Sequence, residues 1–287
     1  IPRMLELFEK NNISVTWATV GMLFNENWEE WQANIPEILP SYTNVALNPY
    51  EYGKKHVKSG LDHYFFAPNL IRLIQNVKGQ EIATHTYSHY YCLETGQTVE
   101  QFRADMEQAV KIARKFDIEL KSLVFPRNQF NKDYLDVCRD NQIETVRTNP
   151  PCWYWDTTKP ETFFTKFART GDAYFPFGKR SYSFNEVEKS KVVGQPASRF
   201  LRPQQSSEFL NNLRLLRIKN EMMQAAKDGE VYHLWWHPHN FGTNTEGAFH
   251  SLKAIMDIFA LCREKYGMES QTMKELKDRV FDAGKEN

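Results

Sequence analysis

Strand-like and helix-like segments alternate along most of this 287-residue chain, and that alternation constrains the fold more than any other feature. Parallel strands need long crossover connections, which helices usually provide, so the alternation predicts a parallel α/β architecture. We expect strands over residues 13–20, 79–84, 122–125, 144–147 and 231–236. We expect helices over residues 1–11, 69–77, 99–116, 132–141, 206–227 and 246–266.

Two regions interrupt the alternation. Residues 25–66 are rich in Trp, Tyr, Asn and Pro, and residues 150–203 are similarly irregular. Connections of this length are uncommon in a compact domain unless they serve a function. We therefore interpret both regions as insertions around the mouth of one barrel-like domain that covers residues 1–287.

The composition narrows the range of partners. Lys and Arg together number 36, as do Asp and Glu, so the formal net charge is zero and no basic field suggests a nucleic-acid partner. No stretch approaches the roughly 20 apolar residues of a membrane-spanning helix. The four cysteines form no CxxC pair, so we expect free thiols. We expect a cytoplasmic protein rather than an exported one, and a targeting segment upstream of Ile1 is left open.

The segment His85-Thr86-Tyr87-Ser88-His89 predicts half of a metal site. Histidines at positions i and i+4 share one face of a helical turn, so both rings can reach one ion. With 8 His in 287 residues, roughly 0.2 such pairs are expected by chance. Spacing alone therefore does not exclude the alternative that the two histidines are ordinary polar residues on a surface turn. The preceding strand favours a site, because α/β proteins place their chemistry at the carboxyl ends of strands.

Two further clusters also follow predicted strands. His237 and His239 alternate, so in an extended segment their side chains would point the same way. His233 lies within the strand and is expected to be structural. The other candidates, each of which has an ordinary loop or surface role as its alternative, are Pro126, Arg127, Asn128, Arg147 and Trp153.

Taken in this order, these segments resemble the polysaccharide deacetylase family, the NodB-homology domains, over most of the chain. The segment HTYSH fits the family's His-[Ser/Thr]-x-x-His metal motif fully. The segment HLWWHPHNFG is similar to the closing strand that delivers a catalytic histidine, and FPRNQ and HPHNF look like a bacterial branch tied to surface polysaccharides. The resemblance implies a distorted (β/α) barrel with fewer than eight strands.

The resemblance is incomplete at three motifs. The family has two aspartates at the end of its first strand, one a base and one a metal ligand, and we expect that strand upstream of Ile1. The family's Arg-x-Pro motif, aligned on Pro126, puts Val124 where the arginine belongs. We therefore expect Arg127 or Arg147 to replace that charge, or a base oriented in another way. The fourth motif, with its aspartate and tryptophan, has no clear counterpart.

The resemblance implies removal of N-acetyl groups from an amino sugar of a polysaccharide or its precursor. It implies one divalent metal on His85 and His89, with zinc expected first and cobalt, nickel, manganese or iron as alternatives. Thr86 would hold the loop by hydrogen bonding. His237 would be the general acid, with His239 in reserve. The expected substrate-binding residues are Pro126, Arg127, Asn128, Arg147 and Trp153.

Other functions stay open on the sequence alone. A non-catalytic carbohydrate-binding relative would explain the aspartates and the motif arginine that this chain does not show. The same scaffold could instead remove O-acetyl esters or open a cyclic imide, or could be a metal-free structural domain. A carbohydrate is the expected partner in most of these cases, and the sequence indicates neither the sugar nor the oligomeric state.

Overall fold

The computed structural model describes residues 1–156, 162–175, 178–187 and 192–282. Within them, five parallel strands form one sheet in the order β1-β2-β3-β4-β5, and β6 pairs in parallel with β7 in a second sheet. The α/β class with a parallel sheet is confirmed, whereas the strands of the described residues close no barrel. The strands are β1 Val15–Thr19, β2 Gln80–Thr84, β3 Ser122–Val124, β4 Thr145–Thr148, β5 Val193–Pro196, β6 Arg199–Phe200 and β7 Leu234–Trp235.

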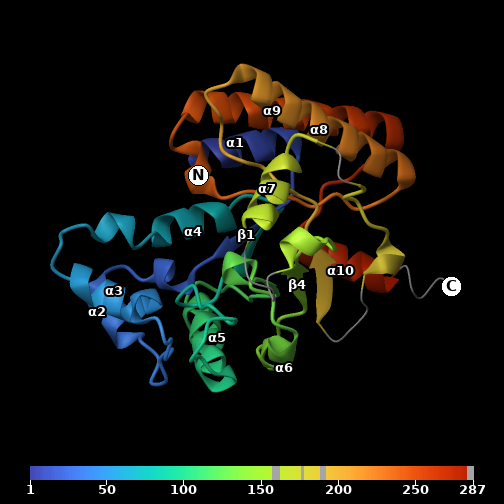
Figure 1. Cartoon of the computed structure of the whole chain (residues 1–287). Coiled ribbons are helices and arrows are strands. Elements are labelled where there is room, and N and C mark those ends of the chain that lie inside the picture. The colour runs from blue at the N-terminus through green and yellow to red at the C-terminus, as the bar shows by residue number, and fades with distance from the viewer. Residues whose placement is uncertain (157–161, 176–177, 188–191, 283–287) are drawn as a thin grey trace.

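The order of strands in the larger sheet follows their order in the chain, and all of its pairs are parallel. The carboxyl ends of β1 to β5 therefore lie along one edge, where the loops that follow them can meet. The expected helices are present, with ends that differ by a few residues, and α1, α8 and α9 lie together on one side of the molecule (Figure 1). They are α1 Pro2–Asn11, α4 Pro68–Gln75, α5 Val99–Arg114, α6 Leu135–Asp140, α8 Glu208–Asp228 and α9 Thr245–Tyr266.

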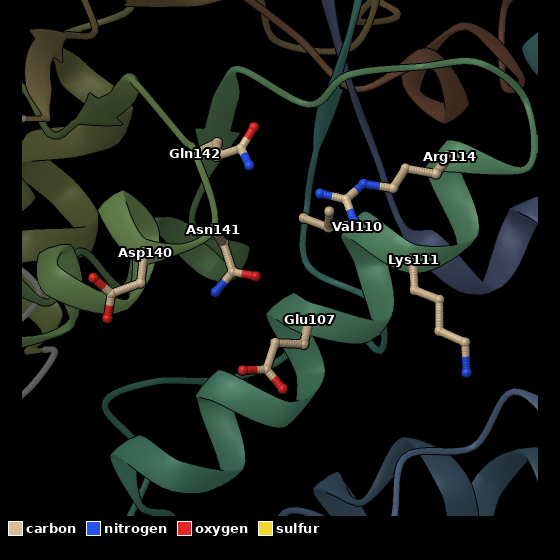
Figure 2. A pocket seen from close by; sticks show the side chains of 7 residues that line it. All are labelled: Glu107, Val110, Lys111, Arg114, Asp140, Asn141 and Gln142. Atoms are coloured by element: carbon tan, nitrogen blue, oxygen red, sulfur yellow. The ribbon is translucent and has the colours of Figure 1, made fainter.

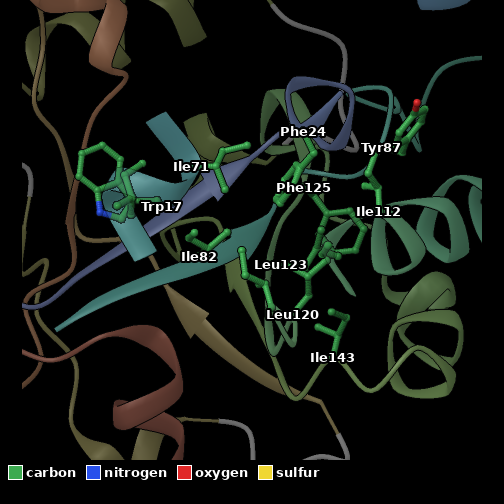
Figure 3. Packing of buried hydrophobic residues seen from close by; sticks show 14 of the residues in the cluster. Trp17, Phe24, Ile71, Ile82, Tyr87, Ile112, Leu120, Leu123, Phe125 and Ile143 are labelled. Carbon is green, nitrogen blue, oxygen red and sulfur yellow. The ribbon is translucent and has the colours of Figure 1, made fainter. Parts of the chain in front are cut away.

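The main core forms between the larger sheet and the helices that connect its strands. Ile82 on β2, Leu123 on β3 and Ile112 on α5 belong to it and are buried (Figure 3). Full burial of an aliphatic side chain contributes about 1.5–3 kcal/mol, so this core holds the strand ends, and the loops that leave them, in fixed positions. A smaller cluster lies between α8 and α9.

Residues 25–66 are more regular than the sequence indicates. They contain two short helices, α2 Trp28–Ala33 and α3 Pro49–His56, capped by the side chains of Asn27 and Asn48. Trp31 and Tyr50 are each 1% exposed and belong to the main core. Helices of six to eight residues are too short to show a reliable hydrophobic period, and the Asn and Pro residues that suggested a loop are their first residues and caps.

Residues 150–203 also contain structure that the sequence pattern does not predict. They include a helix, α7 Phe163–Gly171, and the strands β5 and β6. The sequence of β5 contains Gly194 and Pro196, which favour a turn when read without the neighbouring strand β4. Three parts of this predicted insertion, residues 157–161, 176–177 and 188–191, lie outside the described residues. The strand expected over 231–236 is shorter than predicted, and a further helix, α10 Met273–Asp282, follows α9.

Two expectations from composition concern the chain as a whole. All four cysteines are free thiols, and three of them are buried. In the part of the chain that the structure describes, none of the helices combines the length and the apolar character needed to cross a bilayer.

Candidate active site

His85 is the first residue after β2. Its backbone N–H donates to the carbonyl of Thr19 at 2.9 Å, which extends the pairing of β2 with β1. Its ring Nδ1 lies 2.6 Å from the carbonyl oxygen of Val124, the last residue of β3. Because a carbonyl oxygen can only accept, Nδ1 carries the proton and Nε2 keeps its lone pair. Metal-ligating histidines are usually oriented in this way.

The loop that joins His85 to His89 is not a helical turn, so that part of the prediction is wrong. Thr86 and His89 have φ angles of 64° and 61°, in the left-handed region. Such conformations cost on the order of 1–3 kcal/mol each, and for a β-branched threonine they are rare. The two histidine rings nevertheless meet, with centroids 4.8 Å apart and planes inclined at 65°. The two rings therefore meet as predicted, but a strained loop brings them together and not a helical turn.

Backbone contacts hold this loop on one side. The hydroxyl of Thr86 accepts a hydrogen bond from the backbone N–H of Tyr90 at 2.7 Å and so ties the start of the loop to its end. The carbonyl of Thr86 accepts from the N–H of Gly21 at 2.8 Å. A Cβ atom at Gly21 would lie 2.7 Å from the ring of Tyr87 and 2.9 Å from its Cα, so only glycine allows this approach.

A carboxylate that the sequence interpretation missed holds the loop on the other side. Asp105 on α5 is 1% exposed and accepts hydrogen bonds from the backbone N–H groups of Tyr87, at 2.7 Å, and Ser88, at 3.2 Å. It also accepts from the hydroxyl of Ser88. A signal was present in the sequence, because Asp105 interrupts the apolar face of its helix between Phe102 and Met106. A charged residue at such a position is rarely fully buried without partners.

Tyr91 and Arg127 surround His89. The Nδ1 atom of His89 lies 3.2 Å from the hydroxyl of Tyr91, and the guanidinium of Arg127 lies 4.2 Å from the centroid of the Tyr91 ring. Arg127 also forms an ion pair with Glu94 at 3.6 Å. Arg127 and Asn128 follow Pro126 and both have left-handed φ angles, of 54° and 56°. The turn after β3 is therefore strained beside the histidines, as is common at functional sites.

Arg147 on β4 reaches the same place. Its Nη2 donates to the Oδ1 atom of Asn128 at 2.5 Å, and its guanidinium lies 4.1 Å from the ring centroid of Trp235 on β7. Burial lowers its pKa to about 9. Among the described residues, no acidic side chain forms an ion pair with it. A charged group that is largely removed from water without a counter-ion is costly, which makes this position suited to an anion.

The electrostatics keep both loop histidines neutral. Burial, followed by the charges of His89, Arg147 and His237, lowers the pKa of His85 to about 3. Burial and the charges of Arg127 and His237 lower the pKa of His89 to about 4. A neutral imidazole is the form that binds a metal, so neither ring has to lose a proton at neutral pH.

His237 and His239 follow β7 and lie side by side, with ring centroids 5.0 Å apart and planes inclined at 17°. His237 has an extended backbone and immediately precedes a 3₁₀ turn that begins at Pro238, whereas His239 lies within that turn, so the two do not share the extended segment that the sequence suggested. The ring of His237 packs against the rings of Phe200 and Trp235, with centroid distances of 5.6 and 5.5 Å. Burial, His239 and Arg147 lower its pKa. Its charge contributes in turn, after larger causes, to the lowered pKa values of His85 and His89.

The residues present fit part of a metal site. The Nε2 lone pair of His85 is free, and the ring of His89 is its neighbour. Among residues 1–156, 162–175, 178–187 and 192–282, no group of three His, Cys, Asp or Glu side chains could hold a metal ion. Two neighbouring neutral imidazoles are donors of a kind that zinc binds, and the described residues place no third His, Cys, Asp or Glu side chain with them.

Other parts of the molecule lie apart from this cluster. Trp153 is 60% exposed and packs against Tyr154, and no described contact joins it to the histidines. A surface pocket of about 230 Å³ lies between α5 and α6 and contains none of the candidate residues (Figure 2). It is lined by Glu107, Val110, Lys111, Arg114, Asp140, Asn141 and Gln142.

The protein is expected to lose stability in acid because of His233. Burial and the charge of Arg147 lower the pKa of His233 to about 3 from 6.5. The folded state then keeps this ring neutral while the unfolded state protonates it, so the stabilisation is complete above pH 6.5 and is lost as the pH falls towards 3. We expect up to about 1.4 kcal/mol of unfolding free energy to be lost per pH unit in this window.

Urea unfolding of the metal-free protein between pH 7.5 and pH 5 measures this effect. The His233→Gln variant removes the titrating group and should show a shallower dependence on pH. Equal slopes in the two proteins would contradict the prediction.

Comparisons with known proteins agree with the family resemblance seen in the sequence. The sequence model of the family described as polysaccharide deacetylase matches residues 1–146. A comparison with curated proteins finds no match. Among solved structures, the chain is similar to a presumed polysaccharide deacetylase from Mycobacterium smegmatis, with a TM-score of 0.59 and 13% identity, covering 99% of this chain and 77% of that one. At this identity the likeness shows the fold alone.

A second structure is less similar. The 4-alpha-glucanotransferase from Thermococcus litoralis gives a TM-score of 0.49 and 14% identity, covering 97% of this chain and 33% of that one.

Proposed function

This chain belongs to the polysaccharide deacetylase family, and from that premise we propose that it is a metal-dependent hydrolase that removes N-acetyl groups from an amino sugar. The observation that carries the proposal is the pairing of two neutral histidine rings, 4.8 Å apart, at the carboxyl edge of the sheet. The free Nε2 of His85 adds a ligand atom to that pair, and His237, which follows β7, is the candidate proton donor.

We assign His85 and His89 as two ligands of one divalent metal, with zinc expected first. When bound, such a metal polarises the acetyl carbonyl and lowers the pKa of a bound water. Thr86 keeps the loop closed through its hydrogen bond to Tyr90. Tyr91 fixes the ring of His89 through Nδ1, as Val124 fixes the ring of His85.

We propose that a carboxylate completes this ligand set. It would lie on a further strand, placed between β1 and β7. Among the described residues, β1 is paired only with β2, and β7 only with β6. The ring of Phe8 on α1 packs against the rings of Trp17 on β1 and Trp236 just after β7, with centroid distances of 6.1 and 6.2 Å. These two sheet edges therefore face the same helix. One strand in that place would give the distorted barrel that the family resemblance implies.

Arg147, and not Arg127, is proposed to replace the family's motif arginine. Arg127 is engaged by Glu94 and Tyr91, and its side chain is 49% exposed. Arg147 is partly buried, lies beside the histidines and has no acidic partner among the described residues. A carboxylate base next to the site would therefore find its counter-charge in Arg147.

His237 is proposed as the general acid. Hydrolysis breaks the amide C–N bond, a water oxygen bonds to the acetyl carbon, and the sugar nitrogen must take up a proton as it leaves. His237 is exposed at the end of β7 and can deliver that proton. His239, stacked on His237, is the reserve candidate. Of the predicted substrate-binding residues, Arg127, Asn128 and Arg147 are proposed to contact the sugar; Pro126 is buried at the start of their turn, and Trp153, 60% exposed and apart from the histidines, is proposed to contact only a more distant unit of an oligomer.

Acetate release tests this function directly. We expect the purified protein to release acetate from N-acetylated amino-sugar oligomers, and we expect a chelator to stop the release and added zinc to restore it. O-acetylated sugars provide the matched comparison, since an esterase would prefer them. Zinc-independent release would contradict the metal assignment.

One observation favours a second function, a non-catalytic carbohydrate-binding relative. The described residues bring no carboxylate to the two histidines, so the chemistry depends on a group that they do not include. A protein that binds N-acetylated oligomers but releases no acetate with zinc present would support this second function.

A further inference from the structure

The metal-binding loop has an unusual backbone, and something must hold it in place. Thr86 and His89, its second and fifth residues, both have left-handed φ angles. Tyr87 and Ser88 lie between these two strained positions. A strained segment persists only where the surrounding structure over-determines it, so the contacts of Tyr87 and Ser88 decide whether the two histidine rings meet.

Those contacts converge on a single carboxylate. The N–H of Tyr87 donates to the Oδ1 atom of Asp105 at 2.7 Å, and the N–H of Ser88 donates to Oδ2 at 3.2 Å. The hydroxyl of Ser88 donates to the same Oδ2, and the hydroxyl of Tyr50 donates to it at 3.4 Å. Two successive backbone N–H groups that face an anion form an anion-binding nest, here filled by a side chain of the same protein.

An acid is required at this position for a geometric reason. The carboxylate meets N–H and O–H donors on both oxygens, so each oxygen must accept. An asparagine would turn an NH₂ group towards one set of these donors and leave them without an acceptor. Asp105 also comes from α5, an element of the main core, so it transmits a fixed position to the loop.

The carbonyl side of the loop is held by a separate element. The carbonyls of Thr86 and Tyr87 accept from the N–H groups of Gly21, at 2.8 Å, and Met22, at 2.9 Å. The loop is thus clamped between the turn Gly21–Phe24 and Asp105, and only the Asp105 side of the clamp depends on a charged side chain.

We propose that Asp105 is the positioning residue of the metal site, whose carboxylate fixes the turn at Tyr87 and Ser88 so that His85 and His89 face one ion. This role rests on the proposed metal site, because it acts only through the two histidines. Asp105 touches neither histidine in its hydrogen bonds, and its effect is on the strength and geometry of metal binding rather than on the chemistry itself.

Metal titration of the full chain tests the proposal. Zinc affinity is measured by competition with a chromophoric chelator, and cobalt(II) absorption reports ligand geometry. We expect Asp105→Asn to weaken zinc binding by about 10–100-fold and to change the cobalt spectrum, as replacement of residues that orient metal ligands usually does. Ile143→Ala, in the same core but away from the loop, is the control for lost stability and should lower the melting temperature without changing zinc affinity (Figure 3).

A matched pair of milder variants separates positioning from simple burial. Ser88→Ala and Tyr50→Phe each remove one hydroxyl donor from the same Oδ2 atom, and only Ser88 belongs to the loop. Weaker zinc binding in Ser88→Ala than in Tyr50→Phe supports the proposal, and this comparison also decides it if Asp105→Asn does not fold. Equal zinc affinities in the wild type and Asp105→Asn would overturn the positioning role alone. A wild-type protein that binds no zinc would overturn the metal site and this role together.

Discussion

Replacement of both His85 and His89 by alanine is expected to remove bound metal and to lower the rate of acetate release by more than about 10³-fold. The metal is proposed to supply several kcal/mol of charge stabilisation, and each 1.4 kcal/mol corresponds to about a factor of ten in rate. The two rings are the proposed ligands of the site, and no third His, Cys, Asp or Glu group joins them among the residues that the structure describes. The loss should therefore be nearly complete.

Metal content measured by elemental analysis and acetate release measured on the same samples check this prediction. His250→Ala is the matched control, because His250 is an exposed histidine that lines a surface pocket beside α1. A full metal content in the double variant would count against the site. Circular dichroism is needed as well, because loss of the His85 ring leaves the Val124 carbonyl without its donor.

Replacement of His237 by alanine is expected to lower kcat by about 10²–10⁴-fold while metal content stays unchanged. An amide nitrogen leaves poorly as an anion, so loss of its proton donor affects the chemical step and not metal binding. The ring of His237 packs on Phe200 and Trp235, outside the loop that holds the ligands, so its removal should not disturb that loop.

His239→Ala provides the comparison for this prediction. His239 stacks on His237 and is also exposed, but it is the second residue of the 3₁₀ turn, whereas His237 precedes that turn. A larger loss of kcat in His239→Ala than in His237→Ala would transfer the role of general acid to His239. Near-normal turnover in both variants would show that the proton comes from another group.

The parts of the fold that could be predicted from sequence are those with a long or regular pattern. The amphipathic helix α5 and the short apolar strand β3 were visible because local periodicity matches local structure in them. The strand β5 was missed because Gly194 and Pro196 disfavour a strand locally, and only its pairing with β4 stabilises it. The short helix α2 was missed because it depends on burial of Trp28 and Trp31.

The candidate site shows the same division. Sequence spacing correctly picked out histidines whose rings meet, but the backbone that joins them is a strained loop and not a helical turn. Asp105, 18 residues beyond Tyr87, acts through contacts that no local motif encodes. The sequence does not decide whether Arg127 or Arg147 replaces the motif arginine. Their surroundings separate the two, because Arg127 is paired with Glu94 and Arg147 is not.

The division of the strands into two sheets has a consequence for how such a protein can change. The proposed ligand histidines belong to a loop after β2, whereas the proton donor candidate follows β7. Phe8 on α1 and Arg147 on β4 touch structure on both sides. In this proposal, metal affinity and proton transfer depend on separate segments of the chain. We therefore expect some substitutions to change one of these properties and leave the other unchanged.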